Sequence, residues 1–302
     1  MAILKTDAIV LRAIDYSETS LIVWLFTRAH GRVHVIAKGA RRARSPFEGA
    51  LEPLVRGELV FYRKARPEGL DIAKEFDLQD LHLGLRRDLA RLHRGLYVCE
   101  LLTELSEPEV ASPEAFDAAA ETLAALSSAP FERLEQVLIG CQLRLLGTSG
   151  LAPVLDRCAR CSGSLFPDPG TDNAWFGPGQ GGVLCQVHGQ DDGGGTTAVS
   201  RSVLRRLLAT SLGRLVPAEP AADLEVRRLL DLFLSWHLGR EVRMARWLRP
   251  LARPVAPDRR AAPALLAPTP AGLAPAGPAR GTRGRAAGEP GRPGRPASPS
   301  RT

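Results

Sequence analysis

Four side chains that can bind a metal ion stand in two close pairs. Cys158 and Cys161 form a C-x2-C pair, and Cys185 and His188 form a C-x2-H pair. A two-residue spacer lets both side chains of a pair reach one ion, and two such pairs complete a tetrahedral zinc site. Because all four ligands come from the protein, the spacing predicts a structural zinc site rather than a catalytic one.

The segment between the two pairs is rich in glycine and proline. It has too few apolar residues to build its own core, so we expect the metal to supply the fold of an insert at about residues 155–192. Of the four ligands, His188 has the weakest assignment. Asp191 and Asp192 are the other candidates for the fourth position, and both are poor substitutes. A zinc-dependent nuclease or hydrolase that uses these three residues is the alternative, and it requires an open coordination position.

A basic turn after the third expected strand is the second candidate site. Lys38, Arg41, Arg42 and Arg44 lie within seven residues, beside Gly39. Guanidinium and ammonium groups suit phosphate oxygens, and the release of counterions from the nucleic acid drives such binding. Phosphate contacts carry no sequence information, so the turn predicts binding to the backbone of any DNA strand.

The next strand end extends this basic patch through Arg63 and Lys64. Binding to a single strand also requires aromatic side chains on which bases can stack. The aromatic candidates near these strands are Tyr62, Phe61, Trp24 and Phe47, of which Trp24 and Phe61 fit a core better. In a third interpretation the turn contacts only acidic protein segments, and the chain is a DNA-independent scaffold.

The net charge of +7 does not itself indicate a nucleic-acid surface. Residues 251–302 hold nine arginines and two acidic residues, which accounts for the whole excess, since 9 − 2 = 7. Residues 1–250 therefore balance 31 basic against 31 acidic side chains. The tail is also rich in Pro, Gly and Ala without helical or strand periodicity, so we expect it to be disordered.

The order of the elements predicts an α+β protein. Short apolar runs bounded by turn residues indicate five strands, at 7–14, 20–27, 31–37, 58–63 and 71–78. Five such strands suit a barrel of the oligonucleotide-binding (OB) type over residues 1–80. Apolar stripes with helical spacing then indicate an all-α domain over residues 81–250 that carries the zinc-binding insert.

No convincing catalytic set accompanies these elements. A P-loop of the form G-x4-G-K-[ST] is absent, and Gly147–Gly150 has the wrong frame for a nucleophile elbow. The sequence therefore predicts a protein that is not an enzyme. No apolar run approaches the ~20 residues of a membrane helix, and no signal-peptide pattern opens the chain, so we expect no membrane partner and a cytoplasmic, nucleoid-associated location.

An ordered set of short segments resembles the RecO family of bacterial DNA repair proteins. The segments are AIVL at 8–11, YSETSLIV at 16–23, LFT at 25–27, AKGARR at 37–42, FEGALEPL at 47–54, GLAP at 150–153, LDRCARC at 155–161 and SWHLG at 235–239. The resemblance covers about residues 1–250. Lys38, Arg41 and Arg42 match the basic turn of the family, and the three cysteines match its zinc cysteines, whereas His188 stands where the family usually has Cys.

This resemblance implies a recombination mediator. It implies binding of single- and double-stranded DNA and annealing of complementary strands. The implied partners are RecR and single-strand-binding protein (SSB), with RecA loaded indirectly onto SSB-coated DNA during gap repair. The implied cofactor is Zn²⁺ in a structural role.

Overall fold

The computed structural model describes residues 2–47, 50–64, 70–166, 172–190, 195–214 and 216–248. Contacts group the described residues in one compact unit within Met1–Arg253. The predicted tail at 251–302 lies outside the described residues. Within the described ranges, no helix is long and apolar enough to cross a membrane.

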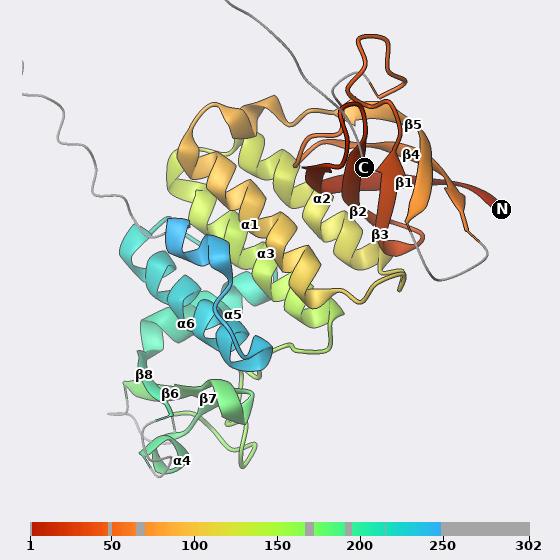
Figure 1. Cartoon of the computed structure of the whole chain (residues 1–302). Coiled ribbons are helices and arrows are strands. Elements are labelled where there is room, and N and C mark those ends of the chain that lie inside the picture. Colours follow the sequence, from red (N-terminus) through yellow and green to blue (C-terminus); the bar gives the residue numbers. More distant parts are fainter. Residues whose placement is uncertain are drawn as a thin grey trace, which may run out of the picture. The chain divides into compact units, whose positions relative to one another are not determined.

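Five strands open the chain, as the sequence predicts (Figure 1). They are β1 (Ala2–Asp15), β2 (Leu21–Thr27), β3 (Gly31–Ala37), β4 (Arg56–Arg63) and β5 (Asp71–Asp80). Pairing in the order β1-β2-β3-β5-β4, with β4 also beside β1, closes them into a barrel. All pairs are antiparallel except β3 with β5, which run parallel over only three residue pairs.

Alternation along the strands separates the inside of the barrel from its outside. In β3, Val33, Val35 and Ala37 are buried in the barrel core, while Arg32, His34 and Ile36 between them are partly exposed. Successive strand residues point to opposite faces, so this alternation aims the polar side chains outward. The loop after β3 returns to the barrel through Phe47, which is 2% exposed.

Helices follow the barrel and form the second part of the unit (Figure 1). The main helices are α1 (Leu89–Leu105), α2 (Pro113–Ser128), α3 (Leu134–Thr148), α5 (Arg201–Ser211) and α6 (Pro220–Leu238). Shorter 3-10 turns are η1 (Leu83–Arg86), η2 (Phe131–Arg133) and η4 (Arg243–Leu248). The side chain of Asp88 accepts a hydrogen bond from the Arg91 amide, and Ser200 accepts one from the Val203 amide, which satisfies orphan donors at two helix starts.

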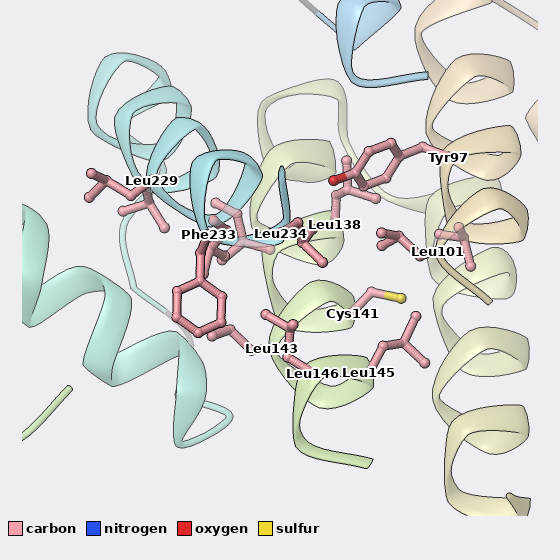
Figure 2. Packing of buried hydrophobic residues seen from close by; sticks show 14 of the residues in the cluster. Tyr97, Leu101, Leu138, Cys141, Leu143, Leu145, Leu146, Leu229, Phe233 and Leu234 are labelled. Carbon is pink, nitrogen blue, oxygen red and sulfur yellow. The ribbon is translucent and has the colours of Figure 1, made fainter. Parts of the chain in front are cut away.

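The helical core gathers leucine and aromatic side chains from α1, α3 and α6. Figure 2 shows Tyr97 and Leu101 facing Leu138 and Cys141, with Phe233 and Leu234 on the other side of α3. Burial of such side chains contributes roughly 1.5–3 kcal/mol each. The barrel joins this core through Phe26, whose ring stacks on Phe116 at 6.5 Å between centroids.

A small sheet that the sequence analysis did not predict is formed by the insert and by the residues that directly follow it. Its strands β6 (Asn173–Gly177), β7 (Gly182–Leu184) and β8 (Thr197–Ser200) pair in the order β7-β6-β8. The connections are η3 (Pro178–Gln180) and α4 (Gln186–Gln190). Phe176 is fully buried and lies 5.9 Å from the Phe233 ring of α6. The buried side chains of the insert belong to the helical core and form no separate cluster among the described residues, as expected of a segment with too few apolar residues for a core of its own.

Candidate metal centre and nucleic-acid interface

The insert brings all four predicted metal ligands to one point. The ligand atoms of Cys158, Cys161, Cys185 and His188 all lie within 4.8 Å of one another. The Nδ1 atom of His188 is 3.3 Å from the Cys185 sulfur and 3.7 Å from the Cys158 sulfur. Three thiols and one imidazole in this arrangement form a donor set that can hold a metal ion.

Tight turns place each pair of ligands. The amide of Cys158 donates to the carbonyl of Gly163 at 3.0 Å, and the amide of Ser162 donates back to the Cys158 carbonyl at 2.8 Å. Ser162 takes a positive φ of 60°, which closes the turn. On the other side the amide of Gly189 donates to the Cys185 carbonyl, so His188 points back toward the sulfur of Cys185.

Local electrostatics favour one thiolate at this centre. Burial of Cys158 opposes ionisation, but backbone hydrogen bonds from Cys185, Cys161 and Arg160 outweigh it and lower the pKa to about 6. The pKa of Cys185 is raised, first by its own burial and then by the neighbouring Cys158. Thiolate is the form that binds a metal, and a bound cation would let the remaining thiols ionise.

The described residues do not test the rival hydrolase site. Its two carboxylates, Asp191 and Asp192, lie outside the described residues. The metal-binding group identified in the described part of the chain contains four protein donors and no carboxylate. Four protein donors are typical of structural zinc sites, whereas catalytic sites leave a position for water.

The basic turn presents its four cations to solvent. Lys38, Arg41, Arg42 and Arg44 are all exposed. The turn is fixed by Gly39, whose φ is +72° and whose carbonyl accepts from the Arg42 amide at 3.1 Å. Within the described ranges, only one of the four is in an ion pair, since Arg41 contacts the exposed Asp15 carboxylate at 3.2 Å.

The two cations predicted at the end of β4 have different surroundings. Arg63 is partly buried, lies over the Phe61 ring and pairs with Asp71 at 3.6 Å, so its charge is largely compensated. Lys64 forms no ion pair with any described carboxylate. It lines a surface groove together with Lys38, so the structure brings cations from two separate loops to one place.

The aromatic side chains predicted to stack on bases are mostly unsuitable. Phe61 and Phe47 are buried in the barrel core. Trp24 is partly buried and stacks on His34 at 4.4 Å between centroids. Tyr62 is partly exposed on the outer face. The sequence analysis missed Tyr16, which is 61% exposed beside Lys38 and Lys64. The sequence signal for Tyr16 was its position directly after the first strand, where a turn exposes side chains.

Comparisons with known proteins give a consistent family. The family model described as "Recombination protein O N terminal" matches residues 1–81, and "Recombination protein O C terminal" matches residues 86–245. A protein of an Anaeromyxobacter species named "DNA repair protein RecO" is 37% identical over 81% of this chain and 95% of its own length. Proteins of the same name from Myxococcus xanthus and Desulfatibacillum aliphaticivorans are each 32% identical over 78% and 82% of this chain, and over 93% and 97% of their own lengths. With a closed barrel, a helical part and a Cys/His centre in the matched residues, this chain belongs to the RecO family, which acts in DNA repair and recombination.

Proposed function

We propose that this chain is a non-enzymatic recombination mediator that binds single- and double-stranded DNA and anneals complementary strands. Residues 1–80 would form a DNA-binding domain of the OB type, and residues 81–250 a helical domain that offers surfaces to protein partners. Following the family, these partners are RecR and single-strand-binding protein, and the outcome is RecA loaded on SSB-coated DNA in gap repair. We further propose a cytoplasmic, nucleoid-associated location.

The observation that carries this proposal is that three cations of the turn are exposed and not neutralised by any described carboxylate. Lys38, Arg42 and Arg44 are exposed and lack described carboxylate partners, so their charges are available to phosphate oxygens. Backbone phosphates repel one another when two strands approach. Cations that neutralise phosphates on both strands lower this repulsion and speed pairing without nucleotide hydrolysis.

The Cys/His centre has a separate, structural role in this proposal. Cys158, Cys161, Cys185 and His188 would hold Zn²⁺, which would cross-link the two turns of the insert. Because the insert packs on α6 through Phe176 and Phe233, its shape would also support the helical domain. Zinc would have no part in DNA chemistry.

The experiment compares two triple variants of the full chain. Lys38→Ala with Arg42→Ala and Arg44→Ala removes the available turn cations. Arg87→Ala with Arg205→Ala and Arg228→Ala removes the same charge from exposed positions on the helical part. Single-strand affinity is measured by fluorescence anisotropy as a function of salt, and annealing is measured with complementary oligonucleotides, with and without SSB.

The slope of log K against log salt is negative, and each phosphate contact on a single strand makes it steeper by about 0.7. Loss of three contacts should therefore make the slope of the turn variant shallower by about 2. The helical variant should keep the wild-type slope and annealing rate. Equal slopes in the turn variant and the wild type would show that the turn is not the contact. Absence of any DNA binding by the wild type would favour a scaffold, and strand cleavage with added Zn²⁺ would favour a hydrolase.

A further inference from the structure

A groove on the barrel combines an exposed aromatic ring, an apolar floor and two cations. It has a volume of about 570 Å³ and is lined by Tyr16, Ile36, Lys38, Lys64, Leu70 and Ile72. We propose that this groove binds an unpaired nucleotide, with the base stacked on Tyr16 and the flanking phosphates on Lys38 and Lys64. The inference rests on the proposed DNA binding and identifies where the chain distinguishes a single strand from a duplex.

Strand register builds the floor of the groove. Ile36 of β3 lies opposite Ile72 of β5 in the short parallel pair, and Ile22 of β2 lies opposite Ile36. The barrel core contains buried chain neighbours of all three isoleucines, so the isoleucines point outward; these neighbours are Val23, Val35, Ala37 and Ala73. The result is a cross-strand row of partly exposed aliphatic side chains, which is a surface for the flat face of a base rather than for a solvated phosphate.

Tyr16 stands at one side of this floor. Its backbone amide donates to the Ser20 carbonyl at 3.0 Å, which fixes the turn between β1 and β2 and therefore the origin of the side chain. Tyr16 is 61% exposed as a residue, in contrast to the buried Phe47 and Phe61 of the barrel core. An exposed aromatic side chain on a fixed backbone turn beside the groove is suited to stacking on a base.

The charges of the groove favour a polyanion. Lys38 and Lys64 come from loops after β3 and β4, so they approach from different strands. Among the described carboxylates, Asp71 is only 12% exposed, accepts a hydrogen bond from the Lys64 amide at 3.0 Å and pairs with Arg63. Asp15 pairs with Arg41. Neither lysine forms an ion pair with a carboxylate in the described part of the chain, so both can contact phosphate oxygens.

Single-stranded nucleic acid fits this combination better than a peptide does. Each nucleotide supplies one apolar face and one phosphate, which is the alternation that the floor and the lysines present. A duplex keeps its bases stacked within the helix, so it reaches Lys38 and Lys64 but not the Tyr16 ring. An acidic peptide with apolar side chains is the competing occupant, and the test below separates the two.

The test measures binding of the full chain with Tyr16→Ala, Tyr16→Phe and the control Phe131→Ala, which removes an aromatic ring that is 63% exposed on the helical part. The probes are oligo(dT), an abasic oligonucleotide of equal length and a duplex. Loss of one stacked base should weaken oligo(dT) binding about 5- to 150-fold in Tyr16→Ala. Tyr16→Phe and Phe131→Ala should bind like the wild type, and Tyr16→Ala should bind the abasic strand and the duplex normally.

The outcomes separate this inference from the proposed function. Normal oligo(dT) binding by Tyr16→Ala overturns the stacking site while DNA binding stands. Equal losses for all three probes also overturn it, because the residue would then act on the backbone or on folding. If the wild type binds no probe, the proposed function fails first. If Tyr16→Ala weakens binding of an acidic peptide with apolar side chains but not of oligo(dT), the groove belongs to a protein partner and the inference is overturned.

A direct readout comes from Tyr16→Trp. A base stacked on the introduced indole should quench its fluorescence when oligo(dT) is added, and the abasic strand should not. The matched control is Phe131→Trp, whose fluorescence should respond to neither strand. Quenching that is the same with the abasic strand would contradict base stacking at this position.

Discussion

Arginine has different surroundings in the helical core and in the barrel turn: it is buried and paired with carboxylates in the core, and exposed in the turn. Arg227 of α6 is 1% exposed and pairs with both Glu135 and Asp231. Arg42 of the turn is exposed and has no partner among the described carboxylates. Each of the two arginines adds one positive charge to the sequence, so composition and net charge cannot distinguish them. Only the position of acidic groups around each one decides whether it holds the fold together or is available to a ligand.

The thiols show the same contrast between the core and the insert. Burial raises the pKa of Cys99 to about 12 and that of Cys141 to about 11, so both stay protonated and act as small apolar side chains. Cys158 has a pKa of about 6 and sits among three other metal-binding atoms. Residue type therefore identifies neither a DNA contact nor a metal ligand without its neighbours.

Removal of the metal should have the largest effect. Structural zinc sites in small peptides bind with about 10–16 kcal/mol, and that binding is coupled to folding. We expect purified protein to contain one zinc per chain by elemental analysis, and Cys158→Ser to lose it together with a cooperative part of the thermal transition. His188→Cys is the matched control, because a fourth thiolate should keep the ion. Zinc-free wild-type protein with an unchanged melting temperature would refute the structural role.

Truncation of the buried arginine should have the next largest effect. Arg227→Ala leaves the partly buried Asp231 without this cation and Glu135 with only Arg94, and breaking a buried pair costs about 3–5 kcal/mol. The Asp231 carboxylate also accepts from the Tyr97 hydroxyl at 2.7 Å, so the loss extends into the α1 contact. Urea unfolding measures the effect, with the exposed neighbour Arg228→Ala as control within about 0.5 kcal/mol. Equal midpoints for both variants would mean that Arg227 is not a structural cation.

Much of the barrel was predictable from the sequence, because its signal is local. Alternation in 31–37 predicts β3 with both ends correct. Strand β1 begins at Ala2, five residues before the expected start at Asp7, since its first residues are held by pairing with β4 rather than by their own pattern. The ligand spacing likewise predicted the Cys/His cluster that the fold assembles.

The remainder depends on contacts that no local pattern contains. Strands β6, β7 and β8 are three to five residues long, and Gly182 must approach Val154 so closely that a Cβ atom there would lie 2.2 Å from the Val154 carbonyl oxygen. The groove beside Tyr16 exists only because β3 and β5, distant in sequence, pair in parallel. Neither the hydrophobic periodicity nor the charge pattern of the sequence indicates that these segments lie side by side.

Alkaline pH should lower the free energy of unfolding through the buried thiol of Cys141, by less than the loss of Arg227 does. The folded pKa of Cys141, about 11, exceeds its ordinary value of 9.0, so the unfolded chain releases this proton first. Stability is therefore fully present below pH 9 and falls as pH rises toward 11. Between pH 8.5 and 10.5 one such thiol should cost about 2 kcal/mol. Cys141→Ala should unfold with a correspondingly flatter pH dependence in urea, and a slope equal to that of the wild type would mean that the thiol is not protected.

The smallest effect should come from Arg41, the turn cation that pairs with a described carboxylate. The Arg41–Asp15 pair is exposed on both sides, so its loss should change the unfolding free energy by about 0–1 kcal/mol. Its consequence lies in binding, because Asp15 competes with phosphate for Arg41. Asp15→Asn should strengthen single-strand binding about 1.5- to 5-fold at low salt. In the Asp15→Asn background, Arg41→Ala should then weaken binding more than it does alone. Additive effects in this cycle would show that the carboxylate does not restrain Arg41, and the turn would then present four equivalent cations rather than three.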